Sequence, residues 1–201
     1  MKIIFKKTPI LLLLFLFYTQ SLYSQWNSNS QTYKAVKYNI EWDLSEFGEW
    51  RIATQNQLPK DMIFCGALKD DAVSASLICI SSDDPIDNVW DNAEDFIESL
   101  NKTLKEQYNK FPGIEKVELQ YEKTYLLFKK ALRFGAIIYI NDIRLSTNEA
   151  IPFLYGGYVF VKGNTIIEPI ILIPWAYVEK YGDEIVDQFF KKISYIDINK
   201  E

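Results

Sequence analysis

Four aspartates, Asp83, Asp84, Asp87 and Asp91, lie in a long acidic connection that precedes a predicted helix. Calcium takes about six to eight oxygen ligands, several of them carboxylates, so this connection is a candidate Ca²⁺ site. The spacing does not fit an EF-hand, because the central glycine and the final glutamate are missing at their required offsets. In the competing interpretation, Asp87 or Asp91 caps the helix and the other carboxylates are solvated charges. We adopt this second interpretation and predict no metal and no cofactor.

The chain contains no histidine, which excludes Ser-His-Asp and Cys-His catalysis, histidine metal sites and imidazole pH switches. It also lacks a P-loop, a dinucleotide-binding glycine motif and a Gly-x-Ser-x-Gly nucleophile elbow. Paired carboxylates can hydrolyse glycosides, but among 27 acidic residues the sequence selects no pair. We therefore predict no catalytic residue and keep a small carboxylate-dependent hydrolase as an alternative function.

Aromatic residues make up 15% of the chain, and an exposed cluster of them could stack on sugars or seat a partner peptide. Tyr155, Tyr158, Trp175 and Tyr177 flank loops or the ends of predicted elements. We name these four residues as the candidate surface for a ligand or partner. The competing interpretation is ordinary core packing, because most of these positions fit an apolar face. A carbohydrate-binding module is a further alternative function.

Cys65 and Cys79 are the two cysteines of the chain, and they lie in the predicted strands Met62–Leu68 and Val73–Ile80. In the hairpin that a short acidic turn forms between these strands, Cys65 faces Ser76. Cys79 then lies three positions beyond this partner, on the opposite face of the sheet. At ~3.3 Å per residue the two Cα atoms are about 10 Å apart, which is beyond disulfide reach. We predict two buried free thiols.

The N-terminus has the pattern of an export signal: lysines precede the short apolar stretch Ile10–Phe17, and small residues follow it. The stretch is shorter than the roughly 20 residues of a membrane-spanning helix, although an uncleaved anchor is the alternative. We predict a signal peptide over residues 1–24 and a flexible polar leader over residues 25–35. The mature protein would be periplasmic or extracellular, without a stable membrane span.

The charge and length of the chain limit its partners and its organisation. A formal net charge of -5 without a basic cluster argues against nucleic acid, because phosphate binding needs concentrated lysine and arginine. The length suits a single domain, which we place at residues 36–195, followed by a tail at 196–201. We expect a monomer whose partner is a protein or a small ligand.

Apolar alternation and periodicity predict the secondary structure. Besides the cysteine hairpin, strands are predicted at about 36–44, 49–53, 116–121 and 132–140, and a helix at Ala93–Tyr108. Two apolar runs around Lys162-Gly163-Asn164 predict that Tyr158–Ile173 is the central hairpin of the fold. Gly156-Gly157 before it indicates a bulge or a close backbone contact, whereas Pro169 indicates that its second strand lies at a bulge or an edge.

The C-terminal part is predicted to be a helix at about Trp175–Ile193, with a kink or a restart at Gly182-Asp183. Residues 143–152 lack a pattern and are predicted to form a surface loop. The order of strands, helix, strands and helix predicts an α+β fold with one antiparallel β-sheet and a helix on each face, an α/β/α sandwich.

This order resembles the PsbP-like family, the fold of the photosystem II oxygen-evolving accessory proteins and their bacterial relatives. The resemblance rests on a tryptophan-bearing strand at Glu49–Ile52, a hairpin, an acidic loop and the helix Ala93–Tyr108, then paired long strands and a closing helix that ends in Phe189–Ser194. It spans about Val36–Ser194. It implies a PsbP-like fold and a binding or assembly role, and no functional residue of the family matches a position here.

We therefore expect an exported, non-catalytic accessory or binding protein. The two ends of the central hairpin are where a binding surface is expected first. Gly156-Gly157 and the loop 143–152 lie at its entrance, and Trp175 and Tyr177 lie at its exit.

Overall fold

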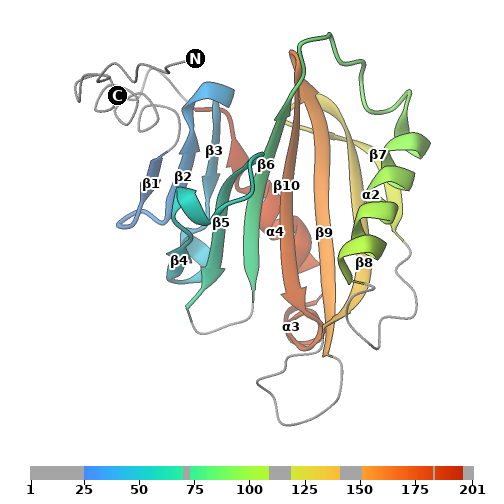
Figure 1. Cartoon of the computed structure of the whole chain (residues 1–201). Coiled ribbons are helices and arrows are strands. Elements are labelled where there is room, and N and C mark those ends of the chain that lie inside the picture. Colours follow the sequence, from blue (N-terminus) through green and yellow to red (C-terminus); the bar gives the residue numbers. More distant parts are fainter. Residues whose placement is uncertain (1–24, 70–72, 109–118, 141–150, 183, 197–201) are drawn as a thin grey trace, which may run out of the picture.

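The computed structural model of this chain describes two antiparallel sheets and three α-helices (Figure 1). The α+β prediction is thereby confirmed. The predicted signal peptide and most of the predicted loop at 143–152 and of the tail lie outside the described residues. The described residues are 25–69, 73–108, 119–140, 151–182 and 184–196.

The larger sheet has the strand order β4-β5-β6-β10-β9-β8-β7, with every neighbouring pair antiparallel. The central hairpin is confirmed, because β9 and β10 lie in the middle of this sheet and Gly163 lies in the turn between them. The strand bounds are β4 (Trp50–Ile52), β5 (Met62–Leu68), β6 (Ser74–Ser81), β7 (Gln120–Leu126), β8 (Lys129–Ile140), β9 (Ile151–Lys162) and β10 (Thr165–Pro174).

The smaller sheet contains β1 (Gln25–Asn27), β2 (Thr32–Ala35), β3 (Ile40–Asp43) and β11 (Ile193–Ser194), in the order β1-β2-β3-β11. The prediction of one strand over residues 36–44 is wrong in its first part. Val36–Tyr38 is a 3₁₀ turn, and Asn39 after it has left-handed backbone with a φ of 53°. Asparagine tolerates this conformation better than most residues, so the chain turns here and β3 begins at Ile40.

Residues 25–35 form β1 and β2, so the prediction of a flexible leader is wrong. Tyr33 is 4% exposed, and its hydroxyl donates a hydrogen bond to the carbonyl oxygen of Ile63 at 2.8 Å. The rings of Trp26 and Tyr33 both stack on Phe64. The segment is polar in composition, which predicts a flexible leader, but its two aromatic side chains pack against the core.

The β7–β8 hairpin also differs from its prediction. The sequence predicts strands at about 116–121 and 132–140, whereas β7 spans Gln120–Leu126 and β8 begins at Lys129, so the turn lies at Leu127 and Phe128. Leu127 and Phe128 have positive φ angles of 51° and 61°, a backbone that favours Gly and Asn. The sequence carries neither of these turn residues here, so the turn had no local signal.

The α-helices in the described part of the chain are α2 (Ala93–Tyr108), α3 (Trp175–Tyr181) and α4 (Glu184–Lys191). The prediction of α2 is confirmed. The predicted closing helix restarts as the sequence allows, but it ends at Lys191, and Ile193 lies in β11. Gly182 ends α3 with a φ of 82°, and its amide donates to the carbonyl oxygen of Val178 at 2.8 Å. Glycine adopts this left-handed backbone without the steric cost of a Cβ, so a restart occurs at the predicted place.

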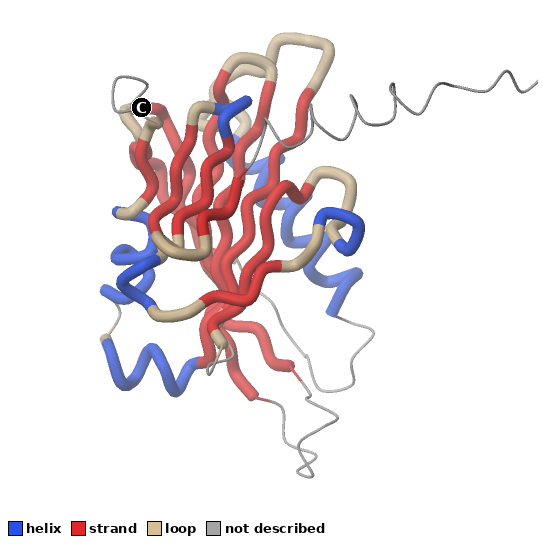
Figure 2. The backbone as a smooth tube through the Cα atoms, turned by 90° about the vertical axis from the view of Figure 1, so that its left-hand side faces the viewer, coloured by secondary structure: helices blue, strands red, loops and turns tan. Residues whose placement is uncertain are grey.

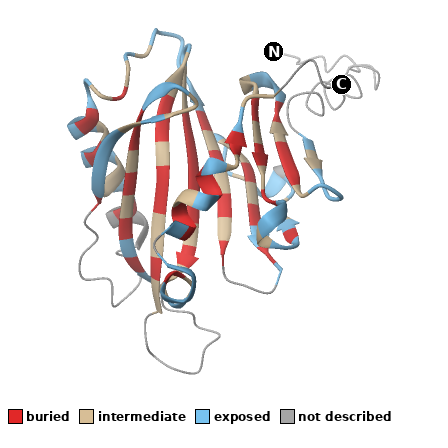
Figure 3. Cartoon of the chain, turned by 180° about the vertical axis from the view of Figure 1, so that it is seen from behind, coloured by how far each residue is buried: buried red, intermediate tan, exposed pale blue. Residues whose placement is uncertain are grey.

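Two apolar clusters lie against the larger sheet, and adjacent residues of one strand contribute to different clusters. In β9, Val159 belongs to the cluster of α2, whereas Phe160 belongs to the cluster that contains α4 and the smaller sheet. Figure 2 views the molecule from the side and shows helices to both sides of the strands, and Figure 3 shows the buried residues from behind. The arrangement differs from one sheet with one helix on each face, because a second sheet and two short helices share one side.

Pro169 is predicted to lie at a bulge or an edge, but β10 is a central strand and its register is unbroken at Pro169, so the prediction is wrong. β10 pairs with β6 through Pro169 and with β9 at Ile167 and Ile170, while the β9 ladder skips Glu168 and Pro169. Proline has no amide hydrogen, and this gap in the ladder accommodates the missing donor.

Gly157 makes the close backbone contact that the paired glycines predict. A Cβ at this position would lie 2.6 Å from the carbonyl oxygen of Pro169 and 2.8 Å from Cζ of Phe134. We expect Gly157→Ala to lower the free energy of unfolding by about 1–3 kcal/mol, as overpacking does. Gly156→Ala is the matched control, because its nearest contact would be 3.5 Å. Urea unfolding measures both variants, and equal losses would contradict the steric explanation.

Candidate functional site

A groove of about 650 Å³ lies on the side of the larger sheet that carries α3 and α4. Its floor is the sheet surface formed by β7, β8 and β9, and Trp175, Val178 and Val186 of α3 and α4 form one wall. We call it the β8–β9 groove. Its volume falls within the range of about 300–1,000 Å³ that is usual for small-molecule sites.

Two glycines lie in the floor of the β8–β9 groove. Gly135 of β8 and Gly156 of β9 lie directly opposite each other, and neither has a positive φ. A Cβ at Gly135 would meet its nearest atom at 3.7 Å and one at Gly156 at 3.5 Å, which are ordinary van der Waals distances. Neither the backbone nor the packing therefore requires glycine, although glycine weakens a strand. Gly135 is half-buried and leaves the floor of the groove open, whereas Gly156 beside it is buried, with Cγ1 of Val186 4.0 Å from the position of a Cβ.

The side chains around the glycine pair are mostly apolar. Ile137 and Tyr139, which follow Gly135 at alternate positions of β8, are each 40% exposed. Leu154 of β9 and Trp175 of α3 also line the groove and are half-buried. The groove therefore offers an apolar surface to solvent.

An ion-pair network lies at the end of the groove next to the glycine pair. Arg133 Nη1 lies 3.1 Å from Glu122 Oε1, and its Nη2 lies 2.8 Å from Asp187 Oδ1. Burial acts to lower the pKa of Arg133, but the hydrogen bond to Glu122 and the charge of Asp187 outweigh it and raise the pKa. The network links β7, β8 and α4, so it holds the floor and one wall of the groove together. Both carboxylates, those of Glu122 and Asp187, are paired with the arginine.

Tyr155 and Tyr158 of the predicted surface lie in different clusters of the core. Tyr155 packs with the α2 cluster, and its ring centroid is 6.0 Å from that of Phe134. Tyr158 packs edge-on against Phe190 of α4 at 4.8 Å. Both are half-buried, so these two residues fit the interpretation as core packing.

Trp175 and Tyr177 both belong to α3, and both are half-buried. Trp175 lines the β8–β9 groove, whereas the ring of Tyr177 lies 4.3 Å from that of Tyr181. Of the four predicted residues, the structure thus brings Trp175 to the groove, and the four together form no flat exposed patch. Sequence reasoning missed Gly135, although a glycine inside a predicted strand is a signal of a bare backbone surface.

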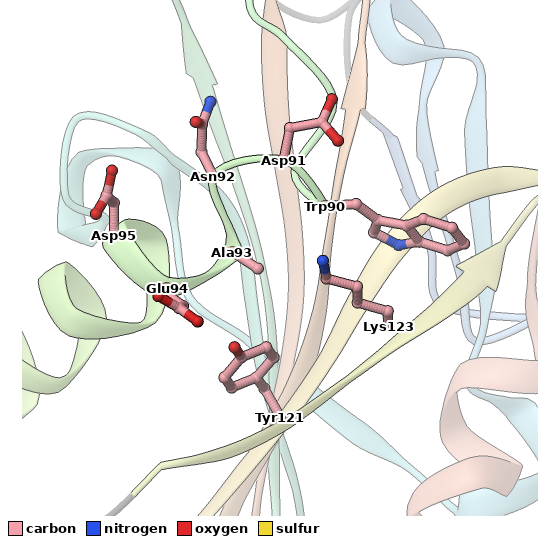
Figure 4. A pocket seen from close by; sticks show the side chains of 8 residues that line it. All are labelled: Trp90, Asp91, Asn92, Ala93, Glu94, Asp95, Tyr121 and Lys123. Carbon is pink, nitrogen blue, oxygen red and sulfur yellow. The ribbon is translucent and has the colours of Figure 1, made fainter.

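A smaller pocket of about 280 Å³ lies between the start of α2 and β7 (Figure 4). Asp91, Glu94 and Asp95 line it, and Figure 4 shows their carboxylates pointing in different directions. The carboxylate of Asp91 accepts a hydrogen bond from the side-chain amide of Asn88. Among the described residues, no three Asp, Glu, Cys or His side chains are grouped closely enough to hold a metal ion. The calcium interpretation therefore gains no support from this part of the chain.

The register predicted for the cysteine hairpin is confirmed, since Cys65 pairs with Ser76. Both thiols are free; Cys79 is buried, whereas Cys65 is only half-buried. Burial raises the pKa of Cys79 to about 12 and also raises the pKa of Cys65. Because the thiolate is the reactive form of cysteine, neither side chain is an activated nucleophile.

One carboxyl group is buried in the centre of the larger sheet. Glu168 of β10 is 6% exposed, and it lies between Ile166 and Ile170, which pack with the α2 cluster. Burial raises the pKa of Glu168 to about 7. Because the β8–β9 groove lies on the other side of the sheet, Glu168 does not form a carboxylate pair with Glu122 of the groove.

No helix in the described ranges is long and apolar enough to cross a membrane. No protein-family model matches the chain, and no curated protein sequence matches it significantly.

The chain is similar to the solution structure of cyanobacterial PsbP from Synechocystis sp. PCC 6803. The TM-score is 0.54 and the identity 12%, and the match covers 83% of this chain and 92% of that one. A crystal structure from Bacteroides thetaiotaomicron VPI-5482 matches 81% of this chain and 47% of its own at 6% identity, with a TM-score of 0.42. The first comparison confirms the predicted resemblance at the level of the fold: the chain has a PsbP-like α+β fold.

Proposed function

We propose that this chain is an exported, non-catalytic binding protein, with an accessory role, that holds an apolar group of another molecule in the β8–β9 groove. The observation that carries the proposal is Gly135, opposite Gly156, which keeps the floor open without a backbone or packing requirement for glycine. The likeness of fold to cyanobacterial PsbP supports an accessory role. The basic and apolar pattern of residues 1–24 supports export.

The charges at the groove favour binding over catalysis. Glu122 is the carboxylate that lines it, and this group is paired with Arg133 at 3.1 Å. A glycosidase needs two carboxylates facing the same substrate bond, one of them free to donate a proton. Asp187, the other acid nearby, is 2.8 Å from the same arginine. The network is thus suited to hold the walls of the groove in place.

The apolar surface of the groove specifies the chemistry of its occupant. Ile137, Tyr139, Leu154 and Trp175 offer contacts to an uncharged body, and the bare backbone between them admits a flat group. Burying apolar surface stabilises a complex by about 25 cal/mol per Å², so a small apolar ligand gains affinity from contact with these side chains. The same chemistry is offered by a small apolar molecule or by apolar side chains of a partner protein.

Filling the floor tests the groove directly. We expect the native chain to bind the uncharged fluorescent probe Nile red, and Gly135→Val to weaken this binding by about fivefold or more, because the added side chain occupies the floor. Valine suits a strand, and a Cβ at this position would lie 3.7 Å from its nearest neighbour, so the free energy of unfolding should not fall. Gly163→Asn, in the β9–β10 turn, is the control and should bind like the native chain. Unchanged binding in Gly135→Val would refute the groove.

The source of the natural occupant is tested with the same pair of proteins. The native chain and Gly135→Val are purified from an envelope fraction, and bound proteins and small molecules are both identified by mass spectrometry. A stoichiometric protein lost from the variant supports an accessory role toward that protein. A small apolar molecule lost from the variant supports a ligand carrier, and identical profiles count against a groove occupant.

A further inference from the structure

The turn between β7 and β8 presents an aromatic side chain to solvent. Phe128 is 97% exposed, more than any other large hydrophobic residue in the described part of the chain. Phe128 and Leu127 both have left-handed backbone, which bulky residues rarely adopt. A turn of this kind favours Asn and Gly, so Phe128 lowers stability locally and gains no packing in return. Such a residue indicates a contact outside the chain.

The turn is held firmly by its surroundings. Leu127 packs against the core, and its carbonyl oxygen accepts a hydrogen bond from the hydroxyl of Tyr195 at 3.0 Å. Leu126 and Lys129 pair directly on the two strands and close the hairpin. Phe128 therefore projects from a fixed point, and its exposure is a built feature of the hairpin.

Lysines surround this turn. Lys129 and Lys130 follow Phe128 directly, and both are exposed. The ladder of β8 with β9 brings the start of β8 beside Lys162, at the end of β9. The ammonium group of Lys162 donates to the carbonyl of Tyr38, and the exposed Lys37 precedes that residue. Lys129 and Lys130 face opposite sides of β8, and the ammonium group of Lys130 lies 5.1 Å from the centre of the Trp90 ring. Four lysines therefore lie around this end of a chain whose formal net charge is -5.

We propose that the Phe128 turn is a docking surface for the anionic face of a lipid membrane. Phe128 enters the interfacial layer, and Lys129 and Lys130 contact the headgroup phosphates. A two-residue tip offers little area to a protein, whereas a stable protein interface buries about 800 Å² on each partner. A bilayer needs no complementary pocket, and lysines near its surface are attracted to anionic lipids.

Acidic residues beside this end limit the strength of the attraction. The amide of Ser82 donates to the carbonyl oxygen of Asn164 at 2.9 Å, so the acidic connection leaves β6 next to the β9–β10 turn. Asp83 and Asp84 follow directly. Their charges oppose an anionic surface, which predicts reversible binding that weakens with salt. Replacing both by asparagine should strengthen the binding.

Phe128→Gly separates docking from folding. Glycine suits the φ of 61°, so this variant should melt at a higher temperature than the native chain. Cosedimentation is measured with vesicles of about 30% phosphatidylglycerol in phosphatidylcholine and with pure phosphatidylcholine. We expect native binding to the anionic vesicles only, and a loss of about fivefold or more in Phe128→Gly. A joint Lys129→Gln and Lys130→Gln variant should bind less and with a shallower salt dependence.

Tyr181→Ser is the matched control, because Tyr181 is 47% exposed but lies at the end of α3. It should bind vesicles like the native chain, and so should Gly135→Val, since the groove is separate from the turn. No binding of the native chain to anionic vesicles would overturn the proposal, as would full binding by Phe128→Gly. Loss of a protein partner in Phe128→Gly without any vesicle binding would assign the turn to a protein interface instead.

Discussion

Replacing Phe189 by alanine is expected to lower the free energy of unfolding by about 3–5 kcal/mol, as for other fully buried phenylalanines. Phe189 of α4 is 0% exposed. Its ring centroid is 3.7 Å from that of Phe47, and it meets Trp50 edge-on at 6.3 Å. The indole nitrogen of Trp42 donates to the backbone carbonyl of Phe189 at 2.9 Å. One residue thus connects α4 with both sheets, and its loss leaves a cavity at their junction.

Urea unfolding followed by circular dichroism measures this loss. Phe189→Leu serves as the control, because it keeps an apolar side chain and should cost much less. A double-mutant cycle with Phe47→Ala should give a coupling of about 0.5–1.5 kcal/mol for the stacked pair. A loss below about 1 kcal/mol in Phe189→Ala would mean that the smaller sheet is not docked on α4.

The stability of the native chain is expected to fall by about 3 kcal/mol between pH 4.5 and pH 7 because of Glu168 alone. Burial raises the pKa of this carboxyl from 4.5 to about 7. Between these two values the folded chain keeps a proton that the unfolded chain has released, so rising pH favours unfolding. The contribution is fully present below the unfolded pKa and is lost once the pH has passed the folded pKa.

Glu168→Gln isolates the contribution of Glu168 to the pH dependence of stability, because the amide has nearly the same shape and does not titrate. The difference in unfolding free energy between variant and native chain should rise from near zero at pH 4.5 to about 3 kcal/mol in favour of the variant at pH 8. Exposed carboxylates such as Glu49, whose pKa is lowered by the hydrogen bond to Lys69, act in the opposite direction and cancel in the difference. Parallel pH profiles would show that Glu168 is not buried as an acid.

Elements with local causes were predictable. The helix Ala93–Tyr108 has its apolar stripe within one segment, and the bounds agree with those of α2. The pairing of Cys65 with Ser76 follows from a short turn, so the register could be counted from the sequence. The restart at Gly182 has its cause in the one residue type that takes this backbone freely.

Elements that depend on contacts with residues far along the chain could not be predicted. Tyr33 forms part of the core, where its hydroxyl donates a hydrogen bond to the carbonyl oxygen of Ile63 in β5. No pattern in the sequence near residue 33 predicts that contact. Pro169 is tolerated in a central strand because the β9–β10 ladder has a gap at its position, which only the pairing of the strands reveals. The turn at Leu127-Phe128 is held by Tyr195, which lies far along the chain.

The sequence by itself determined that no histidine chemistry is available, that a strand-rich α+β fold of PsbP-like order forms, and that the cysteines lie too far apart to bond. Composition, periodicity and short turns carry that information. Only the tertiary structure decided that Gly135 faces Gly156, that Trp175 stands beside them, and that Phe128 lies bare at a basic end. These arrangements depend on strand order and on helix docking, which pair residues remote in the chain, and no local pattern encodes such a pairing.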